Sequence, residues 1–440
     1  MSLGEGLTGR SENPVELLFD TLFHPNADID FGQESRFDWR SRPDLAIPHL
    51  VVGDGEPGGS WQAMHNSMVT LSYGDWMELP GYSLSAALRE SGISDIDTSS
   101  DRVQRSLVAR YYQDYPNKTG IARHMVNHSR VTSVMTTQEA SVQGLCGCGL
   151  MGFLRRFPFL GLLLPPACRE CAKYKWLARV ERRDAETGKV ADVLYVLTNT
   201  VVLATGMFDV PKKVGFPGED FPFVVHSVQA LDALERKITE SSISSQPELD
   251  LESPWVVVVG SGLSAADAVL HLRSQGRNVI HLFQDQKGSS PLSRYSRSAY
   301  PEYASLYRLM KGGARDVDPV STSAYEPLGD AEILGVTRQG HFTVRTSKGA
   351  IFRHKISRIL VLIGSEPFLA FMGPNLPKDA TDNLNPNTCA VEGNKGLYMV
   401  GSLTGSKFVR FGLGTTLAVA RDITRERVAS LSQDHSVKRL

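Results

Sequence analysis

A glycine-rich turn between an apolar strand and a helix carries the strongest chemical signal in the sequence. Residues 255–259 are apolar, residues 260–265 have the sequence G-S-G-L-S-A, and helical spacing continues beyond them. Gly260 permits a tight turn, Gly262 lets a pyrophosphate approach the backbone, and Ala265 lets the helix pack closely on the strand. Free N–H groups and the helix dipole then favour a phosphate, although a glycine turn that serves only packing is the alternative. The pattern predicts a dinucleotide site at Gly260, Ser261, Gly262, Leu263, Ser264 and Ala265.

The end of the next apolar strand, at residues 278–283, bears on which dinucleotide binds. An acidic residue about twenty positions after the glycine motif would hold the ribose 2′-hydroxyl of NAD. Here Asp285 comes late in the segment and Lys287 lies close to it. This arrangement favours a phosphorylated ribose, and therefore NADPH, while a solvated loop would explain the same residues.

Three short motifs resemble elements of flavin-containing monooxygenases. Residues 57–61 have the sequence P-G-G-S-W, similar to a turn that packs beside the flavin. Residues 201–206, V-V-L-A-T-G, resemble the linker from the flavin domain into the pyridine-nucleotide domain. Residues 396–402, G-L-Y-M-V-G-S, resemble a strand end whose aspartate binds the ribityl chain, with Ser402 in the place of that acid. The resemblance implies flavin contacts at Gly58, Gly59, Trp61, Ala204, Thr205, Gly206 and Gly401.

The last glycine-containing segment leads into a predicted helix that begins near residue 415. Gly414 precedes Thr415 and Thr416, and either hydroxyl can cap a helix amino end. A helix start directed at the isoalloxazine ring would stabilise negative charge on reduced flavin. Gly414 and Thr415 are therefore further candidates for cofactor binding, and a glycine loop before an ordinary capped helix is the alternative.

The predicted elements indicate an α/β protein. Apolar strands alternate with helical segments and are nearly continuous in their hydrophobicity, which is typical of parallel sheets. At 440 residues the chain is long enough for two or three domains. The predicted strands are 45–52, 193–204, 256–259, 279–283, 342–345, 359–363 and 397–400, and a further helix is predicted at 102–115.

Taken together, these motifs resemble the oxidative-stress-induced growth inhibitor family, a branch of the flavin-containing monooxygenase-like proteins. The resemblance also rests on segments 6–11, 14–19, 111–115, 204–209, 260–267, 300–303 and 408–411. It implies a two-dinucleotide-binding-domain flavoprotein. In such a fold an FAD-type domain at 1–208 and 359–440 is interrupted by an NAD(P)-binding Rossmann domain at 209–358.

The resemblance implies an FAD- and NADPH-dependent, monooxygenase-like oxidoreductase linked to oxidative stress and negative regulation of cell growth. The alternative is a catalytically weakened regulatory or interaction protein in growth or cell-cycle control that keeps the fold. Ser402 for aspartate and Pro222 in the place of a glycine favour the alternative. So does the expected lack of an amino-terminal strand and G-x-G-x-x-G turn, since no residues before Gly53 have that pattern and FAD would lose its pyrophosphate site.

Composition and cysteine usage limit the other classes of function. Lysine plus arginine is 47 and aspartate plus glutamate is 48, so the net charge of −1 gives no argument for a nucleic-acid partner. Neither a signal peptide nor a membrane-spanning stretch is predicted, and five cysteines fit a reducing, cytoplasmic location. The substrate and the catalytic residues stay unassigned; protein partners in growth control are implied by the resemblance alone.

The sequence contains two weaker candidate sites. Cys146, Cys148, Cys168 and Cys171 could together bind zinc, and the apolar segment between them could contact lipid. A variable loop with free thiols is the favoured interpretation, so no metal site is predicted. His226 is a candidate active-site residue, and a packed or solvated histidine is its alternative.

Overall fold

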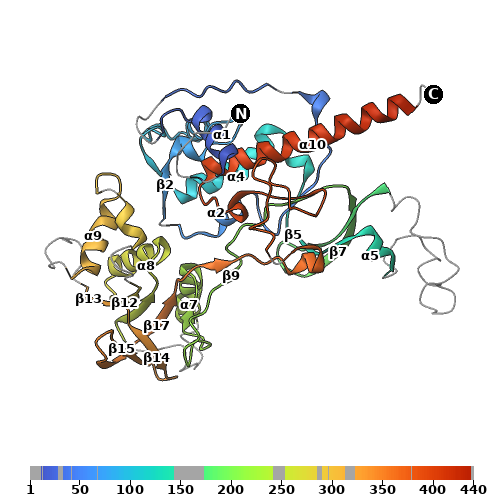
Figure 1. Ribbon diagram of the computed structural model, residues 1–440. Helices are drawn as coiled ribbons and strands as arrows, with labels where there is room; N and C mark the ends of the chain where they lie inside the picture. The colour runs from blue at the N-terminus through green and yellow to red at the C-terminus, as the bar shows by residue number, and fades with distance from the viewer. Residues whose placement is uncertain are drawn as a thin grey trace, which may run out of the picture. The chain divides into compact units, whose positions relative to one another are not determined.

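The computed structural model divides the chain into two compact units. It describes residues 11, 13–27, 33–40, 42–66, 68–142, 173–240, 253–284, 290–295, 297–312, 323–377 and 379–437 (Figure 1). The first unit comprises Met1–Gln62, Val69–Met207 and Pro367–Leu440. The second unit comprises Ala63–Met68 and Phe208–Glu366.

A five-stranded parallel sheet forms the centre of the second unit. Its strand order is β10-β17-β11-β12-β13. The central strands are buried almost from end to end, because both faces of the sheet are covered. Their residues therefore do not alternate between buried and exposed positions. The predicted parallel α/β class is therefore confirmed. The strands are β10 (Val224–Val225), β11 (Trp255–Val259), β12 (Asn278–Phe283), β13 (Tyr325–Gly329) and β17 (Arg358–Val361).

Helices and a small antiparallel sheet complete the second unit. The antiparallel sheet has the order β14-β15-β16 and contributes Phe342 and Val344 to the core around Val257, Ile280 and Ile359. A two-stranded antiparallel pair joins β9 to β18. The elements are α7 (Val228–Glu240), α8 (Leu263–Ser274), α9 (Pro301–Met310), β14 (Glu332–Val336), β15 (His341–Arg345), β16 (Ile351–Lys355), β9 (Val210–Pro211), β18 (Ser365–Glu366) and the 3-10 helix η7 (Pro291–Arg294).

The first unit contains short parallel pairs and a larger antiparallel sheet. β8 (Val201–Leu203) pairs in parallel with β19 (Leu397–Met399), although nearly two hundred positions separate them in the chain. β1 (Val51–Val52) pairs in parallel with β4 (Met125–Val126), and β2 (Val69–Tyr73) pairs with β3 (Arg102–Gln104). The antiparallel sheet consists of β5 (Ser129–Thr136), β6 (Trp176–Arg183) and β7 (Val190–Thr198).

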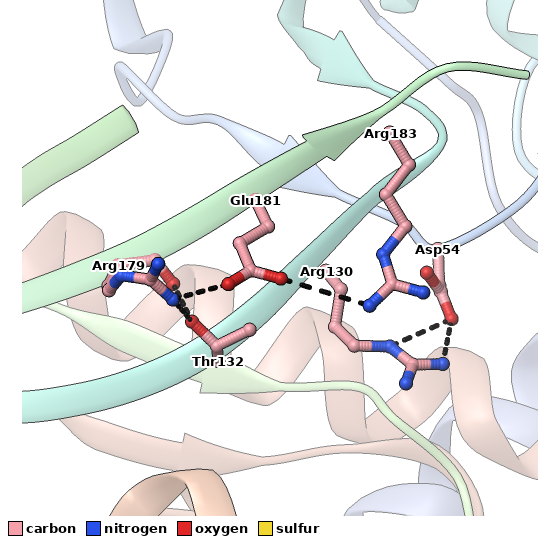
Figure 2. A network of polar contacts seen from close by, with 6 residues as sticks. All are labelled: Asp54, Arg130, Thr132, Arg179, Glu181 and Arg183. Carbon is pink, nitrogen blue, oxygen red and sulfur yellow. Dashed lines mark hydrogen bonds and ion pairs between the residues drawn. The ribbon is translucent and has the colours of Figure 1, made fainter. Parts of the chain in front are cut away.

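Charged side chains on one face of this antiparallel sheet form the network in Figure 2. Arg179 donates hydrogen bonds to Thr132, at 2.7 Å, and to Glu181, at 2.6 Å. Arg130 of β5 donates to Asp54, which follows β1, so this pair joins the sheet to that loop. Half of the Arg130 side chain is exposed, and exposed ion pairs of this kind add little to the free energy of unfolding.

Two helices of the first unit pack closely although they lie at opposite ends of the chain. α1 (Pro14–Phe23) is capped by Asn13, whose side chain accepts hydrogen bonds from the Val15 and Glu16 N–H groups. α10 (Val409–Val437) is the long helix near the C-terminus in Figure 1. The other helices are α2 (Ser60–Ala63), α3 (Leu84–Glu90), α4 (Arg105–Thr119), α5 (Thr137–Val142), and the 3-10 helices η1 (Pro43–Leu45), η2 (Gly74–Met77), η3 (Ala122–His124), η8 (Ala370–Asn375) and η9 (Gly401–Thr404).

Some predicted elements differ from those observed. The strand expected at 45–52 is reduced to β1, because Pro48 has no N–H to donate to a sheet. The strand expected at 193–204 is two strands, since β7 pairs antiparallel with β6 whereas β8 turns to pair in parallel with β19. The part of the chain that the structure describes holds no helix that is long and apolar enough to cross a membrane.

Candidate functional site

The turn between β11 and α8 has a backbone that only glycine can adopt at its first position. Gly260 has φ +143°, in the region that side chains rarely adopt. A Cβ atom there would lie 2.3 Å from the carbonyl oxygen of Leu362, which follows β17, and 3.2 Å from Cβ of Ala265. The glycine therefore allows close approach of the turn, the neighbouring strand and the helix.

Gly262 provides a different feature, an open approach to the helix amino end. It is the N-cap residue of α8, and it has no side chain to cap the N–H groups that follow it. A Cβ atom at Gly262 would meet no atom within 4 Å. Ala265 is fully buried, whereas Ser264 is exposed. The turn thus presents uncapped N–H groups at a surface that a phosphate can reach.

His281 lies beneath this turn, and no sequence motif indicates its role. Its side chain, on β12, is 1% exposed. Nε2 lies 2.8 Å from the carbonyl oxygen of Gly260, and Nδ1 lies 2.8 Å from the hydroxyl of Tyr325 on β13. Burial lowers the pKa of His281 to about 4, so the imidazole is neutral near pH 7. Nε2–H then donates to Gly260, and Nδ1 accepts from Tyr325. The available signal was a histidine within an apolar strand.

The predicted preference for NADPH depends on residues that the structure does not describe. β12 ends at Phe283 and Gln284 is exposed, but Asp285 and Lys287 lie outside the described residues. The preference therefore stays a prediction. The same applies to the zinc alternative, because Cys146, Cys148, Cys168 and Cys171 also lie outside them; the fifth cysteine, Cys389, is buried.

A second group of predicted residues meets at one edge of the first unit. The Val400 N–H donates to the Leu203 carbonyl at 3.0 Å, so the chain leaves β8 and β19 at the same edge. Gly206 and Gly401 both have positive φ, at +79° and +68°. A Cβ atom at Gly206 would lie 3.6 Å from Oγ of Ser402. Ligands of parallel sheets bind at the carboxyl ends of strands, which is where these residues lie.

The predicted cap of α10 is wrong. The helix begins at Val409, so Thr415 and Thr416 lie inside it rather than at its start. Their hydroxyls donate to the carbonyls of Gly412 and Leu413, each at 2.8 Å. Threonine satisfies its hydroxyl in this way within a helix as well as at a cap, which is why the sequence pattern was ambiguous. Thr415 is fully buried.

Gly414 packs against α1. A Cβ atom at this position would lie 2.7 Å from Cα of Glu16 and 3.1 Å from the carbonyl oxygen of Val15. Two residues earlier, a Cβ at Gly412 would lie 3.8 Å from Cα of Gly401. The start of α10 therefore adjoins the β8–β19 edge on one side and α1 on another.

The segment at 57–61 packs against α4. A Cβ at Gly58, whose φ is +112°, would lie 3.1 Å from Cβ of Tyr112, and the Trp61 ring contacts the Tyr112 ring edge-on. Gly59 also has positive φ but open space around it. Trp61 and Val409 both pack on the apolar cluster that contains Tyr112, so this segment and the start of α10 share one core.

His226 is packed rather than solvated, which agrees with one of its two predicted interpretations. Its Nε2 lies 3.2 Å from Oε1 of Glu219. Burial raises the pKa of Glu219, but hydrogen bonds from the Val214 and Gly215 N–H groups and from His226 outweigh it and lower the pKa overall. The pair thus links the segment before β10 to the residue that follows it.

Comparisons with known proteins agree with this geometry. Residues 192–401 match a family model described as pyridine nucleotide-disulphide oxidoreductase. Human oxidative stress-induced growth inhibitor 1 is 32% identical over 438 residues, which cover 96% of this chain and 84% of that protein.

Solved structures share the fold at low sequence identity. Bacillithiol disulfide reductase Bdr from Bacillus cereus has a TM-score of 0.57 at 15% identity, over 94% of this chain and 96% of that one. The FAD-bound cadaverine monooxygenase DfoA from Erwinia amylovora has a TM-score of 0.53 at 13% identity, over 85% and 88% of the two chains.

The parallel sheet with its glycine turn lies in a unit whose main segment, Phe208–Glu366, interrupts the sequence of the first unit. This organisation places the fold among the two-dinucleotide-binding flavoproteins. That class contains proteins of several activities. The 32% identity to the human relative over nearly the whole chain is more specific than the shared fold. The chain belongs to the oxidative stress-induced growth inhibitor family. The predicted family and fold class are confirmed.

Proposed function

We propose that this protein is an oxidoreductase that uses NADPH and FAD in a monooxygenase-type reaction. The observation that carries the proposal is the β11–α8 turn, with Gly260 closed against the core and Gly262 open at the helix amino end. A turn that served only packing would need the first glycine but not the second. The match of residues 192–401 to a pyridine-nucleotide oxidoreductase model supports the same assignment.

The residues of this turn fit a dinucleotide pyrophosphate. The uncapped N–H groups at the start of α8 would donate hydrogen bonds to phosphate oxygens, and Gly262 would let those oxygens reach the backbone. His281 would keep the Gly260 carbonyl turned away from the phosphate by holding it from below. The site therefore presents N–H donors to the phosphate. The Gly260 carbonyl, an acceptor that would repel the phosphate, is directed elsewhere.

The flavin is assigned to the edge where β8 and β19 end. Ala204, Thr205, Gly206 and Gly401 would line the isoalloxazine and ribityl groups there, with the Ser402 hydroxyl as a hydrogen-bonding group. When bound, the two cofactors supply hydride transfer and oxygen activation. The side chains orient these groups and exclude water, so no nucleophilic residue is needed.

A second candidate function is a regulatory or interaction protein that keeps the fold with weakened flavin chemistry. The observation that favours it is Ser402, which stands at the β19 end without the charge of an aspartate. An uncharged hydroxyl accepts a weaker hydrogen bond than a carboxylate does. Flavin binding would then be weaker than in an enzyme that has the acid.

Visible absorbance of the purified full chain distinguishes the two functions. Under the first, the protein binds FAD and NADPH bleaches the flavin absorbance without oxygen. Oxygen then restores it, and Ser402→Asp tightens FAD binding. A folded protein that binds no added FAD and oxidises no NADPH, even as Ser402→Asp, would overturn the oxidoreductase in favour of the regulatory protein.

A further inference from the structure

Two histidines and an aspartate meet in the second unit, apart from the nucleotide turn. They are His65, in the segment Ala63–Met68, Asp232 on α7 and His271 on α8. Each offers one ligand atom, and these atoms lie within 4.8 Å of one another. We propose that His65, Asp232 and His271 form a binding site for a divalent transition-metal ion of the zinc class.

The geometry brings the donors close to the separation that an ion requires. Nε2 of His65 lies 2.7 Å from Oδ2 of Asp232, and the His65 and His271 ring centroids are 4.5 Å apart. Ligands at about 2.0–2.2 Å from a tetrahedral zinc ion are a little over 3 Å from one another. A small widening of the His65–Asp232 contact would therefore admit the ion between the three groups.

The elements that carry the ligands are anchored independently of the ion. Ser227 caps α7, accepting a hydrogen bond from the Ala230 N–H, so that Asp232 follows in the next turn. In α8, the neighbours of His271 in sequence include fully buried Leu272 and Val269, which fix the rotation of the helix. Two of the three ligands thus belong to regular helices rather than to loops.

The donor set selects the class of ion. Two imidazoles and one carboxylate are ligands that zinc and its neighbours prefer, whereas calcium and magnesium require mostly oxygen ligands. The His65 and Asp232 side chains are 17% and 28% exposed, so a water molecule can reach the fourth position. Among the described residues no further histidine or carboxylate joins the group.

Polar side chains lie near the ligands on the two helices. Nε2 of Gln275, one turn beyond His271, lies 3.2 Å from Nε2 of that histidine. Glu235, one turn beyond Asp232, is paired with Arg277 at 3.3 Å. The Gln275 amide donates to a ring nitrogen of His271, so an ion would replace it at that nitrogen or bind the other ring nitrogen. A simple His65–Asp232 hydrogen bond would explain that pair, but it would not require a second imidazole beside it.

Zinc and cobalt titrations of the full chain test the proposal. The parent is a variant with Cys146, Cys148, Cys168 and Cys171 changed to serine, which removes the thiolate ligands that could bind zinc elsewhere. After treatment with a chelator, it is titrated with Zn²⁺ by calorimetry and with Co²⁺ by visible absorbance. We expect about one ion per chain and a cobalt spectrum of nitrogen and oxygen ligands.

The ligand variants give the decisive comparison. We expect His65→Ala and His271→Ala to weaken Zn²⁺ binding at least about a hundredfold, more than loss of an outer partner would. His341→Ala, which removes an exposed histidine of the same unit, should bind Zn²⁺ like the parent. Equal Zn²⁺ affinity of the parent and both ligand variants, or no binding by the parent, would overturn the site.

Asp232→Asn separates metal binding from a structural hydrogen bond. Asparagine keeps an oxygen that can accept from His65 but loses the charge that binds a cation. We expect the metal-free variant to melt at the same temperature as the metal-free parent, and Zn²⁺ to raise the melting temperature of the parent alone. If Zn²⁺ stabilises Asp232→Asn as much as the parent, the carboxylate is not a ligand and the proposal fails.

Discussion

The β11–α8 turn and the β8–β19 edge both depend on glycines, but for different reasons. In the turn, Gly260 is surrounded by core atoms, and residues within one short stretch of sequence make the site. At the edge, Gly206 and Gly401 have positive φ, and an added Cβ would meet one ordinary van der Waals contact at Gly206 and open space at Gly401. The first site is therefore built into the hydrophobic core of the second unit. At the β8–β19 edge, the glycines instead let the backbone turn and leave open space beside it.

The two regions also differ in what stabilises them. Around the turn, buried valines and isoleucines of the parallel sheet dominate. Near the edge, α1 is joined to the start of α10 by buried polar groups. Arg410 lies 3.0 Å from Asp20, and Glu16 accepts hydrogen bonds from Ser11 and Ser406. The free energy of unfolding should therefore be most sensitive to added atoms in the first region and to deleted charges in the second.

The largest effect is expected for Gly260→Ala. The added Cβ would overlap the Leu362 carbonyl in a backbone conformation that alanine rarely adopts. The overlap and strain together should lower the free energy of unfolding by more than about 3 kcal/mol, measured by urea unfolding followed by circular dichroism.

Gly59→Ala is the matched control for strain without a clash. Gly59 has φ +53° and no atom within 4 Å of an added Cβ, so alanine should cost only about 1 kcal/mol. Equal losses in the two variants would show that the Leu362 contact does not close the turn.

A charge-deletion variant tests the first unit. Asp20→Ala would leave the Arg410 guanidinium without its carboxylate, although only 2% of that side chain is exposed. Stacking on Trp76, whose ring centroid lies 4.4 Å away, remains and softens the loss. We expect the free energy of unfolding to fall by about 3 kcal/mol in thermal or urea denaturation.

The exposed pair Arg40–Asp38 provides the comparison. Its charged atoms lie 2.8 Å apart, but the side chains are 82% and 73% exposed. Asp38→Ala should therefore change the free energy of unfolding by less than about 0.5 kcal/mol. If Asp20→Ala changed the free energy of unfolding as little as Asp38→Ala, the result would contradict a stabilising role for the buried contact between α1 and α10.

A pH-dependent loss of stability is expected from His281. Burial lowers its pKa from 6.5 to about 4, so the unfolded chain binds a proton that the folded chain does not between those values. The contribution is complete above pH 6.5 and disappears as the pH falls towards 4. Its size is roughly 3 kcal/mol, from about 1.4 kcal/mol per unit of pKa.

Urea unfolding of the wild type and His281→Gln between pH 7 and 4 measures this contribution by difference. Glutamine can still donate to the Gly260 carbonyl but does not titrate, so the variant should lose less stability on acidification. Tyr325→Phe keeps the imidazole and should retain the wild-type slope. Parallel curves for the wild type and His281→Gln would show that His281 is not the group responsible.

Sequence patterns predicted the turn better than the edge for a physical reason. Gly260, Gly262 and Ala265 act within one strand–turn–helix unit, so their spacing alone indicates their roles. The edge exists because β8 pairs with β19, and no local pattern contains that long-range pairing. Its candidate residues came from a family resemblance instead, and the start of α10 was misplaced because threonine suits both caps and helix interiors.

The same limit explains the side chains that were missed. His281 lies in an apolar strand whose hydrophobicity predicts burial but does not identify the hydrogen bond to Gly260. His65, Asp232 and His271 are separated by long stretches of sequence without the spacing of a metal motif. Only the folded second unit brings these three together.

The smallest effect on stability, and the sharpest on function, is expected for Gly262→Ala. Its φ of −85° is accessible to alanine, and an added Cβ meets no atom within 4 Å. The free energy of unfolding should therefore change by less than about 0.5 kcal/mol. A bound pyrophosphate would contact that methyl group, so the affinity for NADPH should fall by about tenfold, equivalent to about 1.4 kcal/mol.

Fluorescence titration with NADPH, beside urea unfolding of the same preparations, measures both quantities. Gly55→Ala is the control, because Gly55 also has open space around it but lies outside the turn, and it should change neither quantity. Unchanged NADPH affinity in Gly262→Ala would show that the open glycine is not in contact with the nucleotide. The difference between the two regions would then be one of packing alone. Gly260 would keep its structural role, but Gly262 would have lost its proposed ligand.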